Sequence, residues 1–435
     1  MNTEHLLRAA STAMTCCVLG IGASAVRADA VTDWNAITEA TILAASPDPA
    51  VRARTAVIAQ VAVFEAVNSI VGDYEPYHRR LHAPPGAAAE AAAIAAAHRV
   101  LVTMHADRTQ QLDASRDRSL GAIPDGAAKR DGIAVGIAAA DTIVALRAHD
   151  GFDAPVPYTP GTRPGEYRPT PPENLPAFRP GLGQVATFVI RNGRQFRAAP
   201  PPSLRSKKYA RDYDEVKRVG EARSKERPED RLQVARFYDA TDGEQIYYPA
   251  ARQVLAARPR SLSKNARLFA LLSIAMWDGA IACFETKYHF NLWRPVTAIR
   301  EGATDGNDRT EPDANWLAAV FTPPFPSYPS GHATFGGAAR VVLEEEFGPN
   351  GHSITLTNPV VPEIVLTYTT FKQITDDIDD GRIFGGVHYR FDQEAGALMG
   401  ERVGEYVLRH ALRPVRHRCG HRDSEKCSAE LRQQD

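Results

Sequence analysis

Residues 268–295 read LFALLSIAMWDGAIACFETKYHFNLWRP, a long apolar run followed by a basic and aromatic segment. The apolar part, Leu268 to Phe284, has the spacing and length of a helix, and a helix that is apolar on every side is buried. Lys287 and Arg294 follow at its end, seven residues apart. Because a buried cation is costly unless it is paired with an anion, this stretch predicts a core helix that leads into an anion-binding site.

Helical patterns cover most of the remaining chain. Apolar residues recur at helical spacing over the ranges 51–71, 87–104, 132–148, 333–347 and 393–412. β-Branched residues alternate only around Ile354–Thr357 and Ile364–Thr369, which indicates at most a short hairpin. We therefore predict an all-α protein of two packed helical bundles with at most a short β-hairpin.

The composition is that of an ordinary globular protein. The chain has 435 residues, of which 44% are hydrophobic and 24% are charged. Its 51 basic and 52 acidic side chains leave a formal net charge of -1, which argues against a nucleic-acid partner held by bulk charge. The Ala-rich run near residue 95 is interrupted by Glu90 and His98, so we expect no membrane span in the mature chain.

Proline divides the chain into two halves. Residues 151–202 hold 12 of the 31 prolines. We therefore assign residues 31–150 to an N-terminal helical half, residues 151–205 to a proline-rich connection that runs over the surface, and residues 206–415 to a C-terminal helical bundle.

The N-terminus is typical of an exported protein. In residues 1–30, Arg8 precedes a weakly apolar stretch, and Ala28-Asp29-Ala30 offers a cleavage site after residue 28 or 30. This order predicts a secretory signal peptide and a periplasmic or secreted protein, with a helical or disordered arm as the alternative.

Two cysteines lie in a polar C-terminal tail, residues 416–435. Cys419 and Cys427 have seven residues between them, a spacing that suits a small disulfide loop in an exported protein. Three nearby histidines could join them in a zinc site, but the Cys-x2-Cys spacing is missing, so the disulfide is favoured.

Three short motifs in the last third of the chain carry the candidate chemistry. They are Lys287-x6-Arg294-Pro295, then Pro329-Ser330-Gly331-His332, and finally Gly381-Arg382-x5-His388-x3-Asp392. Guanidinium forks and a lysine ammonium suit the oxygens of an oxyanion. A serine hydroxyl and a glycine amide at a helix start add hydrogen-bond donors, and the glycine lets the anion approach the backbone closely.

The two histidines and the aspartate add acid–base chemistry. His332 and His388 supply two imidazoles, one able to bond an electrophilic centre and one able to move protons. Asp392 follows His388 by four residues and could orient that ring if the segment is helical.

Together, the three motifs resemble the signature of the vanadium-dependent haloperoxidases and of the related type 2 phosphatidic-acid phosphatase and bacterial acid phosphatase superfamily. The match covers residues 287–392. Gly381 stands where the family usually has serine, which removes one hydroxyl beside Arg382. The chain length and the helical first half resemble the haloperoxidase branch, so the resemblance implies a vanadium chloroperoxidase-like fold.

The resemblance also implies a role for each motif residue. Vanadate is the implied cofactor, or phosphate in the same site, and its oxygens would be bound by Lys287, Arg294, Ser330, Gly331 and Arg382. His388 would be the apical ligand of vanadium, or the phosphorylated nucleophile of a phosphatase. His332 would be the acid–base residue, and Lys287 would polarise the bound oxidant.

Neighbouring residues suggest the walls of the site. Phe325 stands where a chloroperoxidase-like relative has an aromatic residue that lines the halide pocket. Phe284 and Trp293 could complete a dry wall, or they could simply be core residues. Asp278, in the middle of the apolar helix, is a candidate buried ion-pair partner for one of the arginines.

The expected function is therefore a secreted vanadium-dependent haloperoxidase-like enzyme. It would use hydrogen peroxide to oxidise a halide at a histidine-bound vanadate, with a small organic substrate as the acceptor. The alternatives are a phosphomonoesterase of the acid phosphatase type that uses His388 as nucleophile, and a non-catalytic helical protein with a vestigial phosphate pocket. The oligomeric state stays open, including a homodimer formed through an apolar bundle face.

Overall fold

The computed structural model describes residues 29–415. The predicted signal segment up to residue 28 and the predicted Cys419–Cys427 disulfide lie outside the described residues. Within them the chain forms thirteen α-helices and a single two-stranded antiparallel sheet. This confirms the prediction of an all-α protein with a short hairpin.

The first bundle is built from the N-terminal helices. They are α1 (Ala30–Ala45), α2 (Pro49–Val71), α3 (Ala89–Met104), α4 (Thr109–Gly121) and α5 (Ala127–Arg147). The Asp48 carboxylate caps α2 by accepting from the amides of Ala50 and Val51. The Ala-rich helix α3 packs between α2 and α5. Because α3 offers mainly methyl groups, its neighbours approach its backbone closely.

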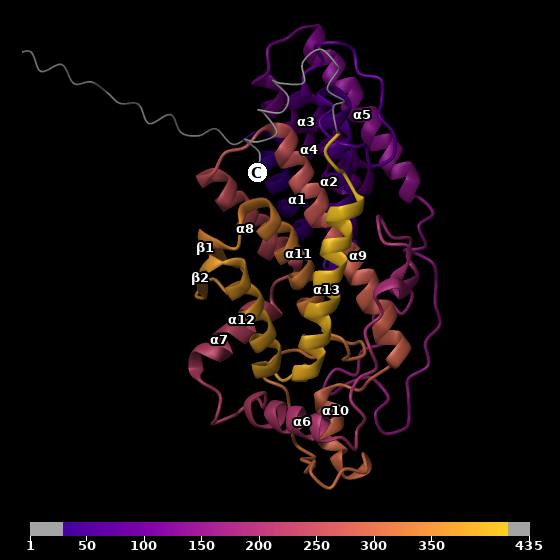
Figure 1. The fold of residues 1–435 in the computed structure, drawn as a ribbon, viewed down its shortest axis with the longest axis vertical. Coiled ribbons are helices and arrows are strands. Elements are labelled where there is room, and N and C mark those ends of the chain that lie inside the picture. The colour runs from indigo at the N-terminus through magenta and orange to yellow at the C-terminus, as the bar shows by residue number, and fades with distance from the viewer. Residues whose placement is uncertain (1–28, 416–435) are drawn as a thin grey trace, which may run out of the picture.

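The second bundle contains the remaining helices and the sheet. They are α6 (Lys207–Val219), α7 (Glu229–Asp239), α8 (Gly243–Ala257), α9 (Leu262–Phe290), α10 (Pro295–Arg300), α11 (Gly331–Phe347), β1 (Asn350–Thr357), β2 (Val365–Thr370), α12 (Phe371–Phe384) and α13 (Arg390–His410). The hairpin lies at one side of the elongated molecule, beside α8 and α12, and α6 and α10 lie at the end opposite the N-terminal helices (Figure 1).

Helix α9 joins the two bundles. It packs against α2 of the first bundle and against α11 and α13 of the second. Ser261 caps its start, and it ends at Asn291 in the left-handed conformation (φ 53°). The helix is therefore longer than the apolar run predicted, and Lys287 lies on its last turn rather than beyond it.

Two helices are long and apolar enough to cross a membrane. They are α2 and α9, and 83% and 89% of their most apolar windows are buried inside the protein. Both are accordingly core helices of the two bundles.

Residues 151–205 form an extended segment, which we call the strap. Its only regular elements are the 3₁₀ turns Leu182–Gln184 and Gly193–Phe196, and both pack against α9. The buried Asp278 carboxylate of α9 holds the strap by accepting from the amides of Phe188 (2.7 Å), Val189 (2.7 Å) and Ile190 (3.0 Å). The prediction that Asp278 pairs with a site arginine is wrong, because backbone amides take up its carboxylate oxygens instead.

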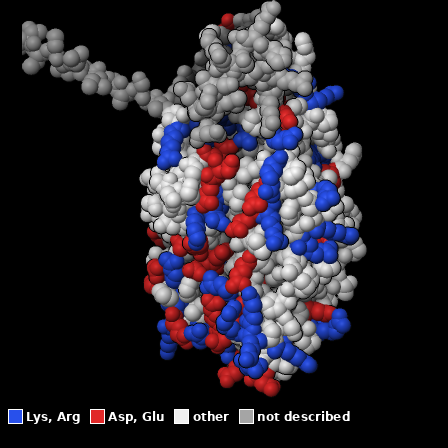
Figure 2. Space-filling model, viewed as in Figure 1, with Lys and Arg blue, Asp and Glu red and all other residues white. Residues whose placement is uncertain are grey.

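Charges of both signs are interspersed on the molecular face shown in Figure 2. Many of them pair locally. Arg390, for example, contacts both Glu215 and Asp380 at 2.6–2.7 Å. Surface charges of opposite sign therefore pair locally, and a buried cation without a carboxylate partner is exceptional against this background.

The Asp278 contact gives a prediction about stability. Asp278→Asn keeps the side-chain volume, but its amide nitrogen cannot accept a hydrogen bond, so at least one strap amide loses its partner. We expect the free energy of unfolding to fall by about 2–3 kcal/mol and proteolysis of the strap to accelerate. Urea unfolding and limited proteolysis measure both effects, with the exposed Asp153→Asn as the matched control.

The same variant should change the pH dependence of stability. Burial raises the pKa of Asp278 to about 6. An unfolded chain loses this proton near pH 4, so the stabilising contribution of the protonated carboxyl is full below that pH and is lost as the pH rises through about 6. The stability gap between the wild type and Asp278→Asn should therefore be wider at about pH 4 than at pH 7. An equal gap at the two pH values would contradict this account.

Candidate anion-binding site

The fold brings the three sequence motifs together at one end of α9. Lys287 lies on the last turn of α9, and Arg294 immediately precedes α10. Arg382 lies on the last turn of α12, and His388 follows it in the connection to α13. All four side chains are at most 2% exposed. Three cations and an imidazole therefore share one buried region.

Lys287 is held by the loop before α11. Its ammonium group donates to the carbonyl oxygens of Pro326 (2.9 Å) and Ser327 (2.8 Å). Burial is the main cause that lowers the pKa of Lys287, and Arg294 adds to the effect. An ammonium group has three protons, so one donor remains for a ligand.

The two arginines are only partly satisfied by protein atoms. Arg294 donates from Nε to the Phe325 carbonyl (2.8 Å) and from Nη1 to the Val387 carbonyl (2.8 Å). Arg382 contacts the Asp239 carboxylate at 3.2 Å. Within residues 29–415, however, Nη2 of Arg294 and Nε of Arg382 are buried without a hydrogen-bond partner. A buried donor left unpaired is costly, so these two atoms are suited to bind an anionic ligand.

His388 is oriented from behind by Asp392. Its Nδ1 lies 2.8 Å from Oδ2 of Asp392, and the same oxygen accepts from the Ser327 hydroxyl (2.5 Å) and the Tyr389 amide (3.2 Å). Burial and the nearby Arg294 lower the pKa of His388 well below its usual value, so the ring is neutral. With Nδ1–H donated to Asp392, the lone pair of Nε2 faces the cations, and Nε2 lies 3.0 Å from Arg294 Nη1.

His332 lies at the start of α11 and lines a small cavity. Its Nε2 lies 3.3 Å from the Thr241 carbonyl, which fixes Nε2 as the protonated nitrogen. Burial, with a contribution from Arg382, lowers the pKa of His332 well below its usual value. The cavity has a volume of about 140 Å³, and Phe284, Phe325 and the buried Cys283 also line it.

Two of the three predicted aromatic wall residues are in place. The rings of Phe284 and Phe325 lie 5.2 Å apart, and the Lys287 ammonium lies 5.0 Å from the centre of the Phe325 ring. The assignment of Trp293 to the wall is wrong. Its indole is buried in a separate aromatic core and donates to the Tyr209 hydroxyl at 3.2 Å.

Packing does not require a glycine at position 381. A Cβ at this position would meet Val234 and Ala235 of α7 at 3.4–3.5 Å, which is ordinary van der Waals contact. The serine usual in the family would therefore fit here without displacing the backbone of either helix.

The sequence did not identify Ser327 or Thr241 as site residues. Ser327 lies between prolines in Phe325-Pro326-Ser327-Tyr328-Pro329, where a serine has no motif of its own. The Thr241 contact involves a backbone carbonyl, which no residue type reveals. Only the regular spacing of His388 and Asp392 hinted that a polar network lay behind the histidine.

The donor set fits an oxyanion rather than a metal cation. In the part of the chain that the structure describes, no group of three or more His, Cys, Asp and Glu residues could hold a metal ion. Instead, hydrogen-bond donors lie beside one imidazole nitrogen. They are the unpaired nitrogens of Arg294 and Arg382 and the remaining proton of Lys287, and there is open space beside Gly331. These donors would hold the oxygens of vanadate or phosphate, and the imidazole nitrogen would face its central atom.

Comparisons with known proteins point the same way. The model of the second helical-bundle domain of vanadium chloroperoxidase matches residues 267–417. The vanadium chloroperoxidase of Curvularia inaequalis is 31% identical over 172 residues, which cover 30% of this chain and 28% of that enzyme. The vanadium-dependent bromoperoxidase of Ascophyllum nodosum is 33% identical over 103 residues, 21% of this chain and 18% of that enzyme. The chain thus spans less than a third of these relatives.

Solved structures extend the likeness to almost the whole chain. The first bacterial vanadium-dependent iodoperoxidase has a TM-score of 0.76 at 26% identity, and the match covers 89% of this chain and 98% of that structure. An apo-type bacterial vanadium-dependent chloroperoxidase has the same fold, with a TM-score of 0.68 at 18% identity over 83% of this chain and 95% of the other. Residues 267–417 are thus similar to the second helical-bundle domain of vanadium chloroperoxidase, and the fold of almost the whole chain is similar to that of bacterial vanadium-dependent haloperoxidases.

Proposed function

We propose that this protein is a vanadium-dependent haloperoxidase that uses hydrogen peroxide to oxidise a halide. One observation carries the proposal: buried, unpaired guanidinium nitrogens of Arg294 and Arg382 lie beside a neutral His388, whose unprotonated Nε2 faces the cations and accepts from Nη1 of Arg294 at 3.0 Å. Bound vanadate would supply an electrophilic centre that activates hydrogen peroxide without a change in the metal's oxidation state.

The cations and the α11 start would hold the vanadate oxygens. Arg294, Arg382 and Lys287 neutralise its charge in a site from which water is largely excluded, where each charge acts strongly. Ser330 caps α11, accepting from the Ala333 amide at 3.4 Å, and its own hydroxyl proton remains available to an oxygen. The amide of Gly331, at the first position of α11, adds a donor aligned with the helix dipole.

His388 and His332 have different roles because their surroundings differ. Asp392 accepts the Nδ1 proton of His388, so Nε2 is the nitrogen that would hold the vanadium. His332 donates from Nε2 to the Thr241 carbonyl, so its Nδ1 is free to take a proton from hydrogen peroxide. A pKa lowered by burial keeps His332 in the neutral form that this step requires.

The small cavity would receive the halide. Phe284 and Phe325 present apolar surface beside the Lys287 ammonium, so a halide there would shed part of its hydration shell and face a positive charge. Arg294 reinforces the charge, with its guanidinium carbon 4.8 Å from the centre of the Phe325 ring.

We also propose that the protein is exported to the periplasm or secreted. The start of α1 favours cleavage after Ala28 over cleavage after Ala30. Asp29 is the N-cap of α1, accepting from the Thr32 amide at 2.9 Å, and it also accepts from the Asn265 side chain. Cleavage after residue 30 would remove this cap and cost about 1 kcal/mol of stability.

Titration of the purified apo-protein with orthovanadate tests the main proposal. Addition of hydrogen peroxide and bromide should then give halogenation of an indicator in proportion to bound vanadate. Para-nitrophenyl phosphate is offered in parallel. Phosphate-ester turnover that vanadate blocks, without any halogenation, would establish the phosphatase alternative and reject the haloperoxidase. Bound vanadate with neither activity would establish the vestigial pocket.

The hydroxyl of Ser327 should matter for cofactor affinity. Ser327→Ala removes the bond that steadies Asp392 behind His388, and loss of such a supporting contact lowers metal affinity by about 10-fold or more. Isothermal titration of the variant with vanadate measures this without turnover. Ser273→Ala is the matched control. Ser273, on α9, is likewise a buried serine with hydrogen bonds, to the Phe269 carbonyl and the Tyr248 hydroxyl. Equal vanadate affinity in the two variants would contradict the role of Ser327.

Export gives a separate prediction. Protein recovered from the medium or periplasm of an expressing cell should begin at Asp29, which intact mass and N-terminal sequencing determine. A chain retained in the cytoplasm with its first residues intact would reject export and leave the proposed chemistry untouched.

A further inference from the structure

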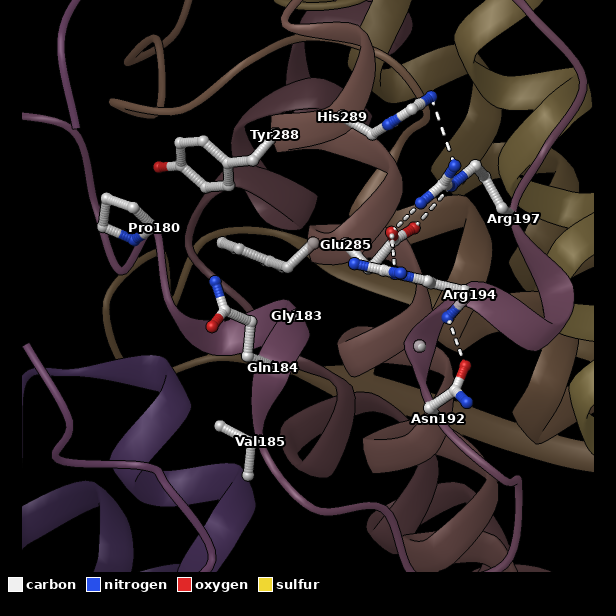
Figure 3. Close-up of a pocket in the computed structure, with 12 residues that line it drawn as sticks. Pro180, Gly183, Gln184, Val185, Asn192, Arg194, Arg197, Glu285, Tyr288 and His289 are labelled. Atoms are coloured by element: carbon white, nitrogen blue, oxygen red, sulfur yellow. Dashed lines mark hydrogen bonds and ion pairs between the residues drawn. The ribbon is translucent and has the colours of Figure 1, made fainter. Parts of the chain in front are cut away.

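A second pocket lies on the outer side of α9, under the strap. It has a volume of about 570 Å³ and is enclosed by the last turns of α9 and by residues 180–185 and 192–197 of the strap (Figure 3). We call it the strap pocket. The named residues of the three motifs do not line it, although Tyr288 and His289, from the spacer of the first motif, do.

The strap pocket and the inner cavity beside the anion site share one lining residue, Phe284. The inner cavity has a volume of about 140 Å³ and is also lined by His332. The inner cavity is too small for an organic molecule of ordinary size, which needs about 300–1,000 Å³. The strap pocket falls within that range, so an organic acceptor has room on the outer side of Phe284.

The walls of the strap pocket are rigid. A Cβ on Gly183 would come within 2.4 Å of the Glu285 backbone, and one on Gly193 would come within 2.9 Å of the Glu285 side chain. The strap backbone therefore rests directly on α9. The Tyr288 hydroxyl adds a bond to the Phe178 carbonyl at 2.6 Å, and the Asp278 contacts fix residues 188–190 between the two strap segments. A preformed pocket needs little reorganisation to bind a ligand.

Charge in the strap pocket favours an anion. The Glu285 carboxylate is the only acid in the lining, and two arginines face it (Figure 3). Arg197 binds it from Nε at 2.9 Å and also contacts His289 at 3.2 Å. Arg194 lies farther away, at 3.6 Å, and its side chain is 80% exposed. One positive charge is therefore left over, and Arg194 carries guanidinium donors that the protein does not use.

We propose that the strap pocket binds the organic acceptor as an aromatic carboxylate. Its ring would lie against Phe284 and Tyr288, and its carboxylate would pair with Arg194. The acceptor role rests on the proposed haloperoxidase function, whereas the binding itself needs no vanadate. Hypohalous acid passing Phe284 would give its halogen to a ring carbon. The ring electron pair forms the carbon–halogen bond, and the displaced ring proton and the hydroxide leave as water.

Binding to the vanadate-free full chain tests the assignment. Isothermal titration with 4-hydroxybenzoate should give a measurable Kd, with weaker binding of phenol, which lacks the carboxylate, and of acetate, which lacks the ring. Arg194→Ala should weaken 4-hydroxybenzoate binding by about two- to five-fold, the effect of one exposed ion pair, and leave phenol binding unchanged. Arg194→Glu should weaken it further.

Arg191→Ala is the matched control, because Arg191 is an exposed arginine of the same strap that does not line the pocket. Equal loss of 4-hydroxybenzoate binding in the Arg191 and Arg194 variants, or equal affinity for phenol and 4-hydroxybenzoate, would overturn the proposal.

A separate experiment measures turnover. In vanadate-loaded enzyme, Arg194→Ala should raise KM for 4-hydroxybenzoate without changing kcat. Arg194-dependent binding without any vanadate-dependent halogenation would count against the proposed function and still support the pocket.

Discussion

The structure depends on the burial of three cations at one end of the helix that joins its two bundles. A lysine and two arginines removed from water would each be costly if left without partners. Backbone carbonyls carry much of the compensation: those of Pro326 and Ser327 receive the ammonium of Lys287, and those of Phe325 and Val387 receive Arg294. The proline-rich loop before α11 must therefore lie where it does, and its path also sets the start of α11. The N–H donors of these cations that no carbonyl accepts remain available to a bound ligand.

This arrangement explains why the site could be predicted from the sequence in outline. Charged and titratable residues at fixed spacing identify themselves, because few other roles require Lys287, Arg294, Arg382 and His388 in that order. The central helix α9 could also be predicted from the sequence, because a helix that is apolar on every side must be buried. Residue types alone predict only that the ligand is an oxyanion. The family resemblance then predicted vanadate as the cofactor.

The errors have a common physical cause. A buried carboxylate such as Asp278 can be satisfied by an arginine or by backbone amides, and the sequence does not distinguish the two. Trp293 follows Lys287 by six residues, yet the helix ends between them at Asn291, and the turn directs the indole into a different core. Ser327 acts through a hydroxyl whose importance arises only when α13 brings Asp392 to it. In each case the partner is distant in sequence, and tertiary packing decides the outcome.

The buried Cys283 has a consequence for the proposed haloperoxidase activity. Its thiol lines the inner cavity, is fully buried, and lies 3.7 Å from the Pro329 carbonyl. Burial raises the pKa of the Cys283 thiol, so it stays protonated. Oxidants attack the thiolate far faster than the thiol. The apolar enclosure that would favour a poorly hydrated halide thus also keeps this sulfur in the less reactive thiol form, a short distance from where the proposed activity would form a strong oxidant.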